Sequence, residues 1–438
     1  MLSRLAALRP SGLWRHPDFL RFWTSETVSL LGTQATLLAV PLTAALLLDA
    51  TPPQMGVLGA VGGAAAFLAG FSADPLVDRL RLKPLLVGAD LANAAILLTV
   101  PLAWAVGALG MAQLYAVEFL VGGLSTVSYV AAQSWLPSVV GRGRLVDANG
   151  KLRASEALSQ TAGPSLAGGL AQLAGAPLVL VLDALSFLAS ARLLGSVRAA
   201  EPARVRTKRA DASERGVPRT VIRTAAEFTE GLRFTLGHPV LRALLASSIT
   251  FNVFAGVFAA LFVIFATREL GLAPAALGAV LAVQGVGGVL GALFVGRMVG
   301  RLGQGPVLVL AGAGQGVGWL ALPAAGASGI PAVPTLALAL AVSGFSFVAY
   351  VVGAVSLRQE LTPDGLLGRV NAGSVSLILA AVPVGSLLGG LLAAETGTRT
   401  VLALGALLGA SGFLWTLFSP VRRLGGAGQE VRPGKAGG

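Results

Sequence analysis

The sequence contains no cysteine, only two histidines and few charged residues. Without cysteine the chain forms no disulfide, performs no thiol chemistry and holds no metal through a thiolate. The two histidines lie far from any spacing that structural zinc sites use, so we expect no metal and no cofactor. Charged residues make up 12% of the chain, whereas soluble domains contain about 25%. This shortage favours a membrane protein.

Apolar and small residues take the place of the missing charge. The chain is 55% hydrophobic and contains 58 glycines among its 438 residues, and its mean hydropathy is +0.78. Small residues let transmembrane helices approach one another closely. The composition therefore predicts an all-α integral membrane protein.

Twelve segments are long and apolar enough to cross a bilayer, which takes about 20 residues of helix. They form two groups of six, separated by the polar stretch 196–238. The predicted spans are 19–48, 54–76, 84–106, 111–135, 152–173, 177–195, 240–266, 274–296, 306–325, 333–357, 372–394 and 399–419. We expect an N-terminal bundle (1–195), a cytoplasmic linker loop (196–238), a C-terminal bundle (239–420) and a disordered tail (421–438). Within the linker, residues 221–235 predict a short interfacial helix.

Basic residues gather on one side of the predicted membrane. Of the 32 lysines and arginines, only Arg268 and Arg399 fall in or beside loops on the far side. By the positive-inside rule the basic side is cytoplasmic, so both termini lie in the cytoplasm. The net charge of +12 then reflects topology, and we expect no nucleic-acid partner.

The two groups of helices repeat one another at a constant offset in residue number. His16-Pro17 returns as His238-Pro239, and an arginine follows each pair at Arg21 and Arg242. Three further pairs are separated by the same offset as His16 and His238: Asn149 and Asn371, Gly163 and Gly385, and Gly168 and Gly390. The repeat predicts two six-helix bundles that face each other and enclose a pathway.

Two motifs connect the sequence to a known family. The loop after the second span runs from Gly70 through Asp78-Arg79 to Arg81 and Lys83, and the fifth span contains Gly163-Pro164 followed by Gly168-Gly169. With the repeat of six helices, this sequence resembles the major facilitator superfamily. Its loop signature and its antiporter motif imply gating residues, which are Asp78, Arg79, Arg81, Lys83, Gly163, Pro164 and Arg369.

Two shorter segments resemble one branch of that family, the macrolide-efflux and enterobactin-exporter-like proteins. They are Leu182-Asp183-Ala184-Leu185-Ser186-Phe187 and Gly368-Arg369-Val370-Asn371. The resemblance implies a multi-pass protein of the bacterial cytoplasmic membrane, with a monomer as the usual state. It also implies that Gly163-Pro164 lets the fifth helix approach the eighth, where matching small residues are Gly285, Gly287, Gly288 and Gly291.

Acidic residues inside the predicted spans need a reason, because a charge at the centre of a membrane helix costs about 2.5–3.5 kcal/mol. All four lie in the first half: Glu26, Asp90, Glu118 and Asp183. Each has a structural alternative. In this alternative, Glu26 pairs with Arg21, Asp90 pairs with Arg79 or Arg81, and Glu118 and Asp183 have packing roles.

Polar stripes on four helices mark candidate cavity faces. Glu26 shares a helical face with Ser29, Thr33 and Thr36, and Glu118 shares one with Gly122, Ser125, Tyr129 and Gln133. In the second half the stripes contain Ser248, Asn252 and Gly256, and Ser343, Ser346 and Tyr350. The family resemblance places these helices around a central cavity. The candidate proton-coupling and substrate-binding residues are Glu26, Thr33, Glu118, Tyr129, Asn252 and Tyr350. For Tyr350, and for Trp319, packing is the alternative.

We expect a secondary active transporter that exports a hydrophobic or amphipathic small molecule by proton antiport. Its partners are then the substrate, protons and the lipid bilayer. A facilitator or importer of a small organic solute, or a membrane sensor without flux, remains open. The sequence shows no nucleophile–base pair, and glycine strings such as Gly312-Ala313-Gly314-Gln315-Gly316 lie inside apolar spans, so we expect no enzyme.

Overall fold

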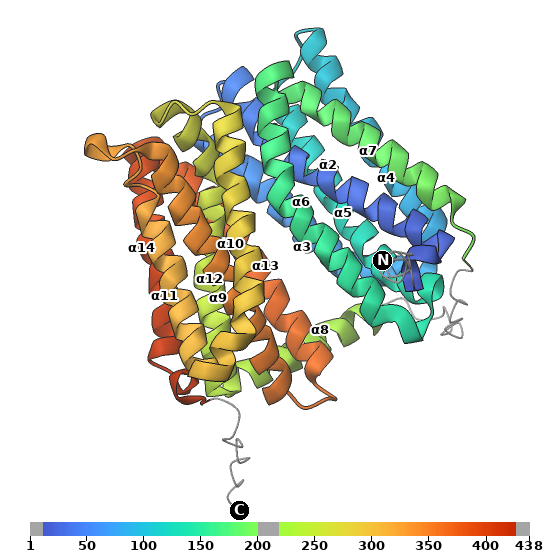
Figure 1. Cartoon of the computed structure of the whole chain (residues 1–438), viewed down its shortest axis with the longest axis vertical. Coiled ribbons are helices and arrows are strands. Elements are labelled where there is room, and N and C mark those ends of the chain that lie inside the picture. Colours follow the sequence, from blue (N-terminus) through green and yellow to red (C-terminus); the bar gives the residue numbers. More distant parts are fainter. Residues whose placement is uncertain (1–11, 200–218, 426–438) are drawn as a thin grey trace, which may run out of the picture. The chain divides into compact units, whose positions relative to one another are not determined.

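The computed structural model describes residues 12–199 and 219–425, and this part of the chain consists of helices joined by short loops, with no strand (Figure 1). The long helices of the first half are α2 (Pro17–Leu47), α3 (Pro52–Arg79), α4 (Leu82–Ala105), α5 (Met111–Val140), α6 (Leu145–Ala174) and α7 (Ala176–Ser196). Those of the second half are α9 (Pro239–Ile264), α10 (Pro274–Leu302), α11 (Gln304–Ala321), α12 (Ala332–Leu361), α13 (Leu367–Thr396) and α14 (Thr398–Leu417). The remaining elements are η1 (Gly12–Arg15), η2 (Arg142–Arg144), α8 (Arg219–Gly237), η3 (Phe265–Glu269), η4 (Ala327–Gly329) and η5 (Pro420–Arg423).

Each of the predicted spans falls on one of these long helices. Within the described residues, 10 helices are long and apolar enough to cross a membrane. The two that fall short are α6, which contains Asp147, Lys151, Arg153 and Glu156, and α11, in which Gln304 and Gln315 lower the mean hydropathy. The all-α membrane class is confirmed, whereas the count of twelve spans and the cytoplasmic termini stay predictions.

The repeated His-Pro pair starts the first long helix of each half. His16 Nδ1 accepts a hydrogen bond from the Phe19 backbone N–H at 3.2 Å, and His238 Nδ1 accepts one from Leu241 at 3.5 Å. Such bonds satisfy backbone donors that have no partner inside the helix. Proline fits the first helical position because it lacks the N–H that would be unpaired there.

A repeated glycine makes the tight connection before the last helix of each half. Gly175, between α6 and α7, has φ 90°, and Gly397, between α13 and α14, has φ 88°. An L side chain is strained at these angles, so only glycine turns the chain so sharply. The two glycines are separated by the same offset as His16 and His238, which extends the repeat from sequence to backbone conformation.

The chain divides into two compact units. Unit 1 consists of Met1–Glu214 and Ala259–Ala282, and unit 2 of Arg215–Phe258 and Val283–Gly438. This division passes through α9 and α10, so the predicted bundle boundaries stay predictions. In unit 1, α7 packs against α2 and α4, and in unit 2, α11 packs against α12 and α14 (Figure 1).

The linker contains the helix predicted at 221–235, which extends over Arg219–Gly237 as α8. It packs against α13, where a Cβ at Gly231 would collide with the Arg369 carbonyl. Arg369 also donates to Glu230 Oε2 at 2.8 Å. Arg369, predicted as a gating residue, thus connects the linker helix to α13 within unit 2.

Candidate functional site

Asp183 is the centre of a buried polar cluster in unit 1. Its side chain is fully buried in α7, where Thr36 Oγ1 of α2 donates to one carboxylate oxygen and Ser186 Oγ donates to the other at 2.9 Å. A Cβ at Gly32 would collide with Asp183 Oδ1 and Ser186 Oγ. Gly32 therefore makes the space in which a carboxylate of α7 lies against the backbone of α2.

Asp90 on α4 extends this cluster. It is 4% exposed, contacts the Ser190 hydroxyl, and lies near enough to Glu26 and Asp183 for their charges to interact. Its Oδ2 has no hydrogen-bond partner among the described residues, and the same holds for both amide atoms of the fully buried Asn93 one turn further on. Three acidic residues therefore share the interior between α2, α4 and α7.

The sequence suggested ion pairs for Glu26 and Asp90, and these predictions are wrong. Arg21 binds Asp18 at 3.1 Å and donates to the Ser196 carbonyl at 3.1 Å, so it does not neutralise Glu26. The side chains of Arg79 and Arg81 are exposed, whereas Asp90 is buried. In the described part of the chain, Glu26 takes part in none of the ion pairs and stays half-buried on α2.

Glu118 occupies a separate place, where α5 crosses α3. Its Oε1 would lie 2.8 Å from a Cβ at Gly62, so the carboxylate rests directly against the α3 backbone. It is half-buried and forms no ion pair in the described part of the structure. Tyr129, further along α5, is 48% exposed, and its hydroxyl accepts from Arg153 at 3.1 Å. Thr33 is half-buried on the same helix as Glu26.

Unit 2 contains a cavity of about 210 Å³ with aromatic walls and uncharged polar groups. Its lining residues are Phe251, Asn252, Phe254, Ala255, Phe258, Gln284, Gln315, Trp319, Leu340, Ser343 and Phe347. Asn252 and Ser343 were predicted from the polar stripes. A volume below the usual range for drug-sized ligands, roughly 300–1,000 Å³, fits one part of such a molecule.

The rings around this cavity hold one another in place. Trp319 packs against Phe254 at 4.4 Å between centroids and edge-on against Phe251 at 5.6 Å. Tyr350 lies edge-on to Phe251 at 5.0 Å, and its buried hydroxyl donates to the Leu244 carbonyl at 3.4 Å. Tyr350 supports the wall from behind, since it is not among the lining residues.

Two glutamines of the cavity escaped the sequence reasoning. Gln284 and Gln315 both lie in glycine-rich strings, which resemble chance matches to phosphate loops. Gln315 is 3% exposed, and its Oε1 has no hydrogen-bond partner in the described structure. Asn252, by contrast, donates to the Ser248 carbonyl at 2.8 Å. A buried amide in an apolar span is costly unless it finds a partner, and that cost was the signal available in the sequence.

The predicted gating residues have different surroundings. Lys83 Nζ donates to the Val197 carbonyl at 2.8 Å, which ties the start of α4 to the end of α7. Arg79 and Arg81 are exposed, and the side chain of Asp78 lies outside the described part of the structure. Gly163 packs on Gln34 of α2, where a Cβ would lie 2.5 Å from the glutamine Cβ.

The small-residue contact of α6 differs from the expectation. Gly168 and Pro164 face Gly278 and Pro274 at the start of α10, and a Cβ at either glycine would collide with the opposite proline carbonyl. Three of the four glycines predicted for this contact lie elsewhere. Gly287, Gly288 and Gly291 pack against α12. The prediction followed the right helices but chose a segment too far along α10.

One ion pair of unit 1 was not predicted from the sequence. Arg268 binds Asp49 at 2.9 Å and donates to the Ala45 carbonyl at 3.0 Å. Asp49 has φ 46°, an uncommon conformation for a residue other than glycine. No group of three or more histidine, aspartate or glutamate side chains in residues 12–199 and 219–425 is arranged to hold a metal ion.

Comparison with known proteins gives one family and several similar folds. The sequence model described as Major Facilitator Superfamily matches residues 22–267 and 243–435. No curated protein matches the chain. A solved structure of nucleoside transporter NupG has a TM-score of 0.70 at 12% identity and covers 92% of this chain and 99% of its own.

Two further solved structures have similar folds and comparable TM-scores. A bacterial homologue of the iron transporter ferroportin, in an inward-facing state, has a TM-score of 0.68 at 18% identity, over 91% of this chain and 99% of its own. The peptide transporter POT, in complex with alafosfalin, has a TM-score of 0.68 at 13% identity, over 96% of this chain and 99% of its own. Likeness at these identities shows the fold alone.

Proposed function

The chain belongs to the major facilitator superfamily, and on that basis we propose that this membrane transporter exports a hydrophobic or amphipathic small molecule by proton antiport. The observation that carries the proposal is the cavity of unit 2. Aromatic rings form its walls, and the unpartnered Gln315 Oε1 offers a hydrogen-bond acceptor among the described residues. A ligand with an apolar body and one N–H or O–H donor satisfies both features.

Proton coupling rests on the acids of unit 1. Glu26 and Glu118 are half-buried and form no ion pair with the described residues, so nothing there holds them permanently charged. Each gains or loses a proton as its exposure to water changes. In an alternating-access cycle a bound proton leaves on one side of the membrane and returns on the other, while the substrate moves in the opposite direction. Asp90 lies near enough to Glu26 for their charges to interact, so a charge on one of these acids disfavours a charge on the other.

The export direction rests on the resemblance of Gly163-Pro164 and Gly168 to the antiporter motif of this family. The contact of this segment with Gly278 and Pro274 supports a specific role for it in packing. A facilitator of a neutral solute is the second candidate, because none of the described residues that line the cavity of unit 2 is charged.

Reconstitution into proteoliposomes tests the function directly. We would impose a pH gradient, add a panel of amphipathic cations and neutral compounds, and record internal pH and labelled compound together. Compound-triggered collapse of the gradient with movement of the compound supports antiport. Movement without any proton response indicates a facilitator. Binding without movement of any compound in the panel contradicts transport and favours a sensor.

A further inference from the structure

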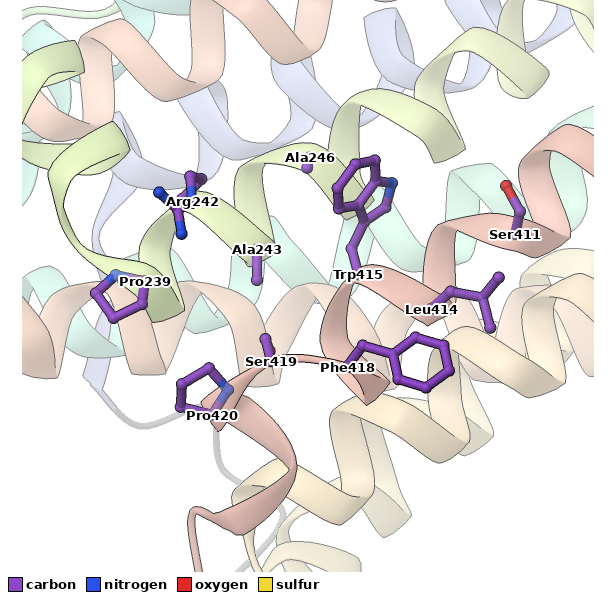
Figure 2. Close-up of a pocket in the computed structure, with 10 residues that line it drawn as sticks. All are labelled: Pro239, Arg242, Ala243, Ala246, Ser411, Leu414, Trp415, Phe418, Ser419 and Pro420. Atoms are coloured by element: carbon purple, nitrogen blue, oxygen red, sulfur yellow. The ribbon is translucent and has the colours of Figure 1, made fainter.

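A groove on the surface of unit 2 lies between the start of α9 and the end of α14, with a volume of about 510 Å³ (Figure 2). The lining residues are Pro239, Arg242, Ala243, Ala246, Ser411, Leu414, Trp415, Phe418, Ser419 and Pro420. Both helix ends belong to the side that the basic residues predict to be cytoplasmic. The groove is distinct from the aromatic cavity and shares no lining residue with it.

The charge of the groove is of one sign. Arg242 is the only charged residue among the described lining residues, its side chain is exposed, and it belongs to none of the ion pairs in the described part of the chain. Arg422 and Arg423, both exposed, follow the lining residue Pro420 closely in η5. A guanidinium without a carboxylate partner favours an anion, and it binds phosphate oxygens through two parallel hydrogen bonds.

The apolar part of the groove continues along the exposed face of α14. Leu404, Leu408, Trp415 and Phe418 repeat at helical spacing on this face, and they are 56%, 50%, 54% and 78% exposed. The stripe from Leu404 to Phe418 covers about 21 Å of helix, whereas half of the hydrocarbon core measures about 15 Å. The exposed face is therefore long enough to accompany one acyl chain from the interface to the bilayer centre.

Trp415 joins the polar and apolar parts. Its indole Nε1 donates to Thr250 Oγ1 of α9 at 3.2 Å, which fixes the ring across the groove (Figure 2). Tryptophan prefers the depth at which acyl chains meet headgroups. Arg242 lies on the neighbouring helix and lines the same groove, so the depth of the ring and the position of the cation agree.

We propose that this groove binds one anionic glycerophospholipid, with the phosphate at Arg242 and an acyl chain along Leu414, Trp415 and Phe418. The charge argues for an anionic lipid over a zwitterionic one, because the described lining residues offer no carboxylate to a headgroup ammonium. The site does not depend on the proposed transport function, since it requires only that α9 and α14 lie in a membrane.

Native mass spectrometry of the purified full chain tests the site with phosphatidylglycerol and phosphatidylcholine as probes. We expect one tightly bound phosphatidylglycerol and weaker binding of phosphatidylcholine. Arg242→Gln should weaken phosphatidylglycerol binding about fivefold, in line with one basic residue at a membrane surface. It should weaken phosphatidylcholine binding less, because the choline ammonium offsets part of the attraction between the lipid phosphate and the arginine. Trp415→Ala should weaken the binding of both lipids. The matched control is Arg142→Gln, which removes an exposed arginine outside the groove.

A thermal shift on the same variants gives a second readout that does not depend on counting bound lipids. Phosphatidylglycerol should raise the unfolding temperature of the wild type and of Arg142→Gln more than that of Arg242→Gln. Equal binding of the two lipids to the wild type overturns the proposal. An unchanged preference of Arg242→Gln for phosphatidylglycerol over phosphatidylcholine also overturns it. So does a stable dimer in which the α14 face of a second copy fills the groove.

Discussion

The interior of the first half contains four acids at positions where the second half contains uncharged residues. At the offset that relates His16 to His238, Glu26, Asp90, Glu118 and Asp183 correspond to Ser248, Gly312, Leu340 and Gly405. A side chain at Gly312 would meet Phe413 and the ring of Phe251, and one at Gly405 would meet Val257 and the ring of Phe254. The duplicated scaffold has therefore placed ionisable groups in one half and an aromatic cavity in the other.

One buried polar group is common to both halves. Asn93 on α4 and Gln315 on α11 correspond to each other at the same offset, and each is buried with an amide oxygen that has no partner in the described structure. In the first half the amide follows Asp90 by one turn, and in the second it lines the cavity. The same amide position thus lies beside an acid in the first half and in the cavity in the second. From this difference in surroundings we infer that the first half handles the coupling ion and the second binds the substrate.

The largest expected effect is on proton flux, which separates proton coupling from substrate binding. Glu26→Gln removes the carboxylate that we propose exchanges protons but keeps its size, so substrate-driven proton flux in proteoliposomes should fall to background while the compound still binds. Glu118→Gln tests the second acid in the same assay. Glu395→Gln, which changes an exposed acid at the end of α13, should behave as the wild type. Full proton flux in both variants would break the assignment of coupling to the first half.

The next largest effect is on the free energy of unfolding, and it compares one closely packed glycine from each half. Gly256 in α9 faces the Val382 carbonyl of α13, whereas the atoms nearest to Gly32 in α2 belong to the side chains of Asp183 and Ser186. Backbone yields less easily than a side chain, so Gly256→Ala should lower the free energy of unfolding by about 1–3 kcal/mol, and Gly32→Ala by less. Gly88→Ala has open space and should be neutral or stabilising. Denaturant unfolding in detergent gives the ranking, and the reverse order would contradict it.

A moderate effect is expected from the paired amides. Gln315→Leu removes the acceptor from the cavity and should weaken substrate binding about tenfold, the equivalent of about 1.4 kcal/mol. Asn93→Leu makes the same change in the first half and should leave affinity unchanged. Intrinsic tryptophan fluorescence follows the binding, since Trp319, one of the six tryptophans, lines the cavity. Equal losses in the two variants would mean that substrate contacts both halves.

The smallest effect concerns the repeated helix start. Partial burial lowers the pKa of His238, so the folded state disfavours its charged form and the unfolded state binds more protons near the ordinary pKa of about 6.5. Stability is then fully present above that pH and declines as the pH falls toward the folded pKa. His238→Asn keeps a cap acceptor without a proton to gain. Unfolding temperatures at pH 8 and pH 5 should differ less in this variant, and an unchanged difference would exclude His238 as a source.

Sequence reasoning located the helices because apolar length, prolines and helix-start residues are local signals. The positions of all four acids also followed directly, since a charge in an apolar span stands out. Their partners did not, because Thr36 and Asp183 lie 147 residues apart. Gln284 and Gln315 were missed because their glycine-rich surroundings resembled chance motifs. Gly278 was missed because which glycines touch depends on how far one helix slides along another.

Isothermal titration calorimetry separates proton coupling from substrate binding. A transported compound is titrated in buffers of different ionisation enthalpy, which counts the protons released on binding. We expect the wild type to release protons on binding. Glu26→Gln or Glu118→Gln should bind with similar affinity but release fewer protons, and Gln315→Leu should bind more weakly with the same release per bound molecule. Unchanged proton release in both glutamate variants, or a change of release in Gln315→Leu, would contradict the division of tasks between the two halves.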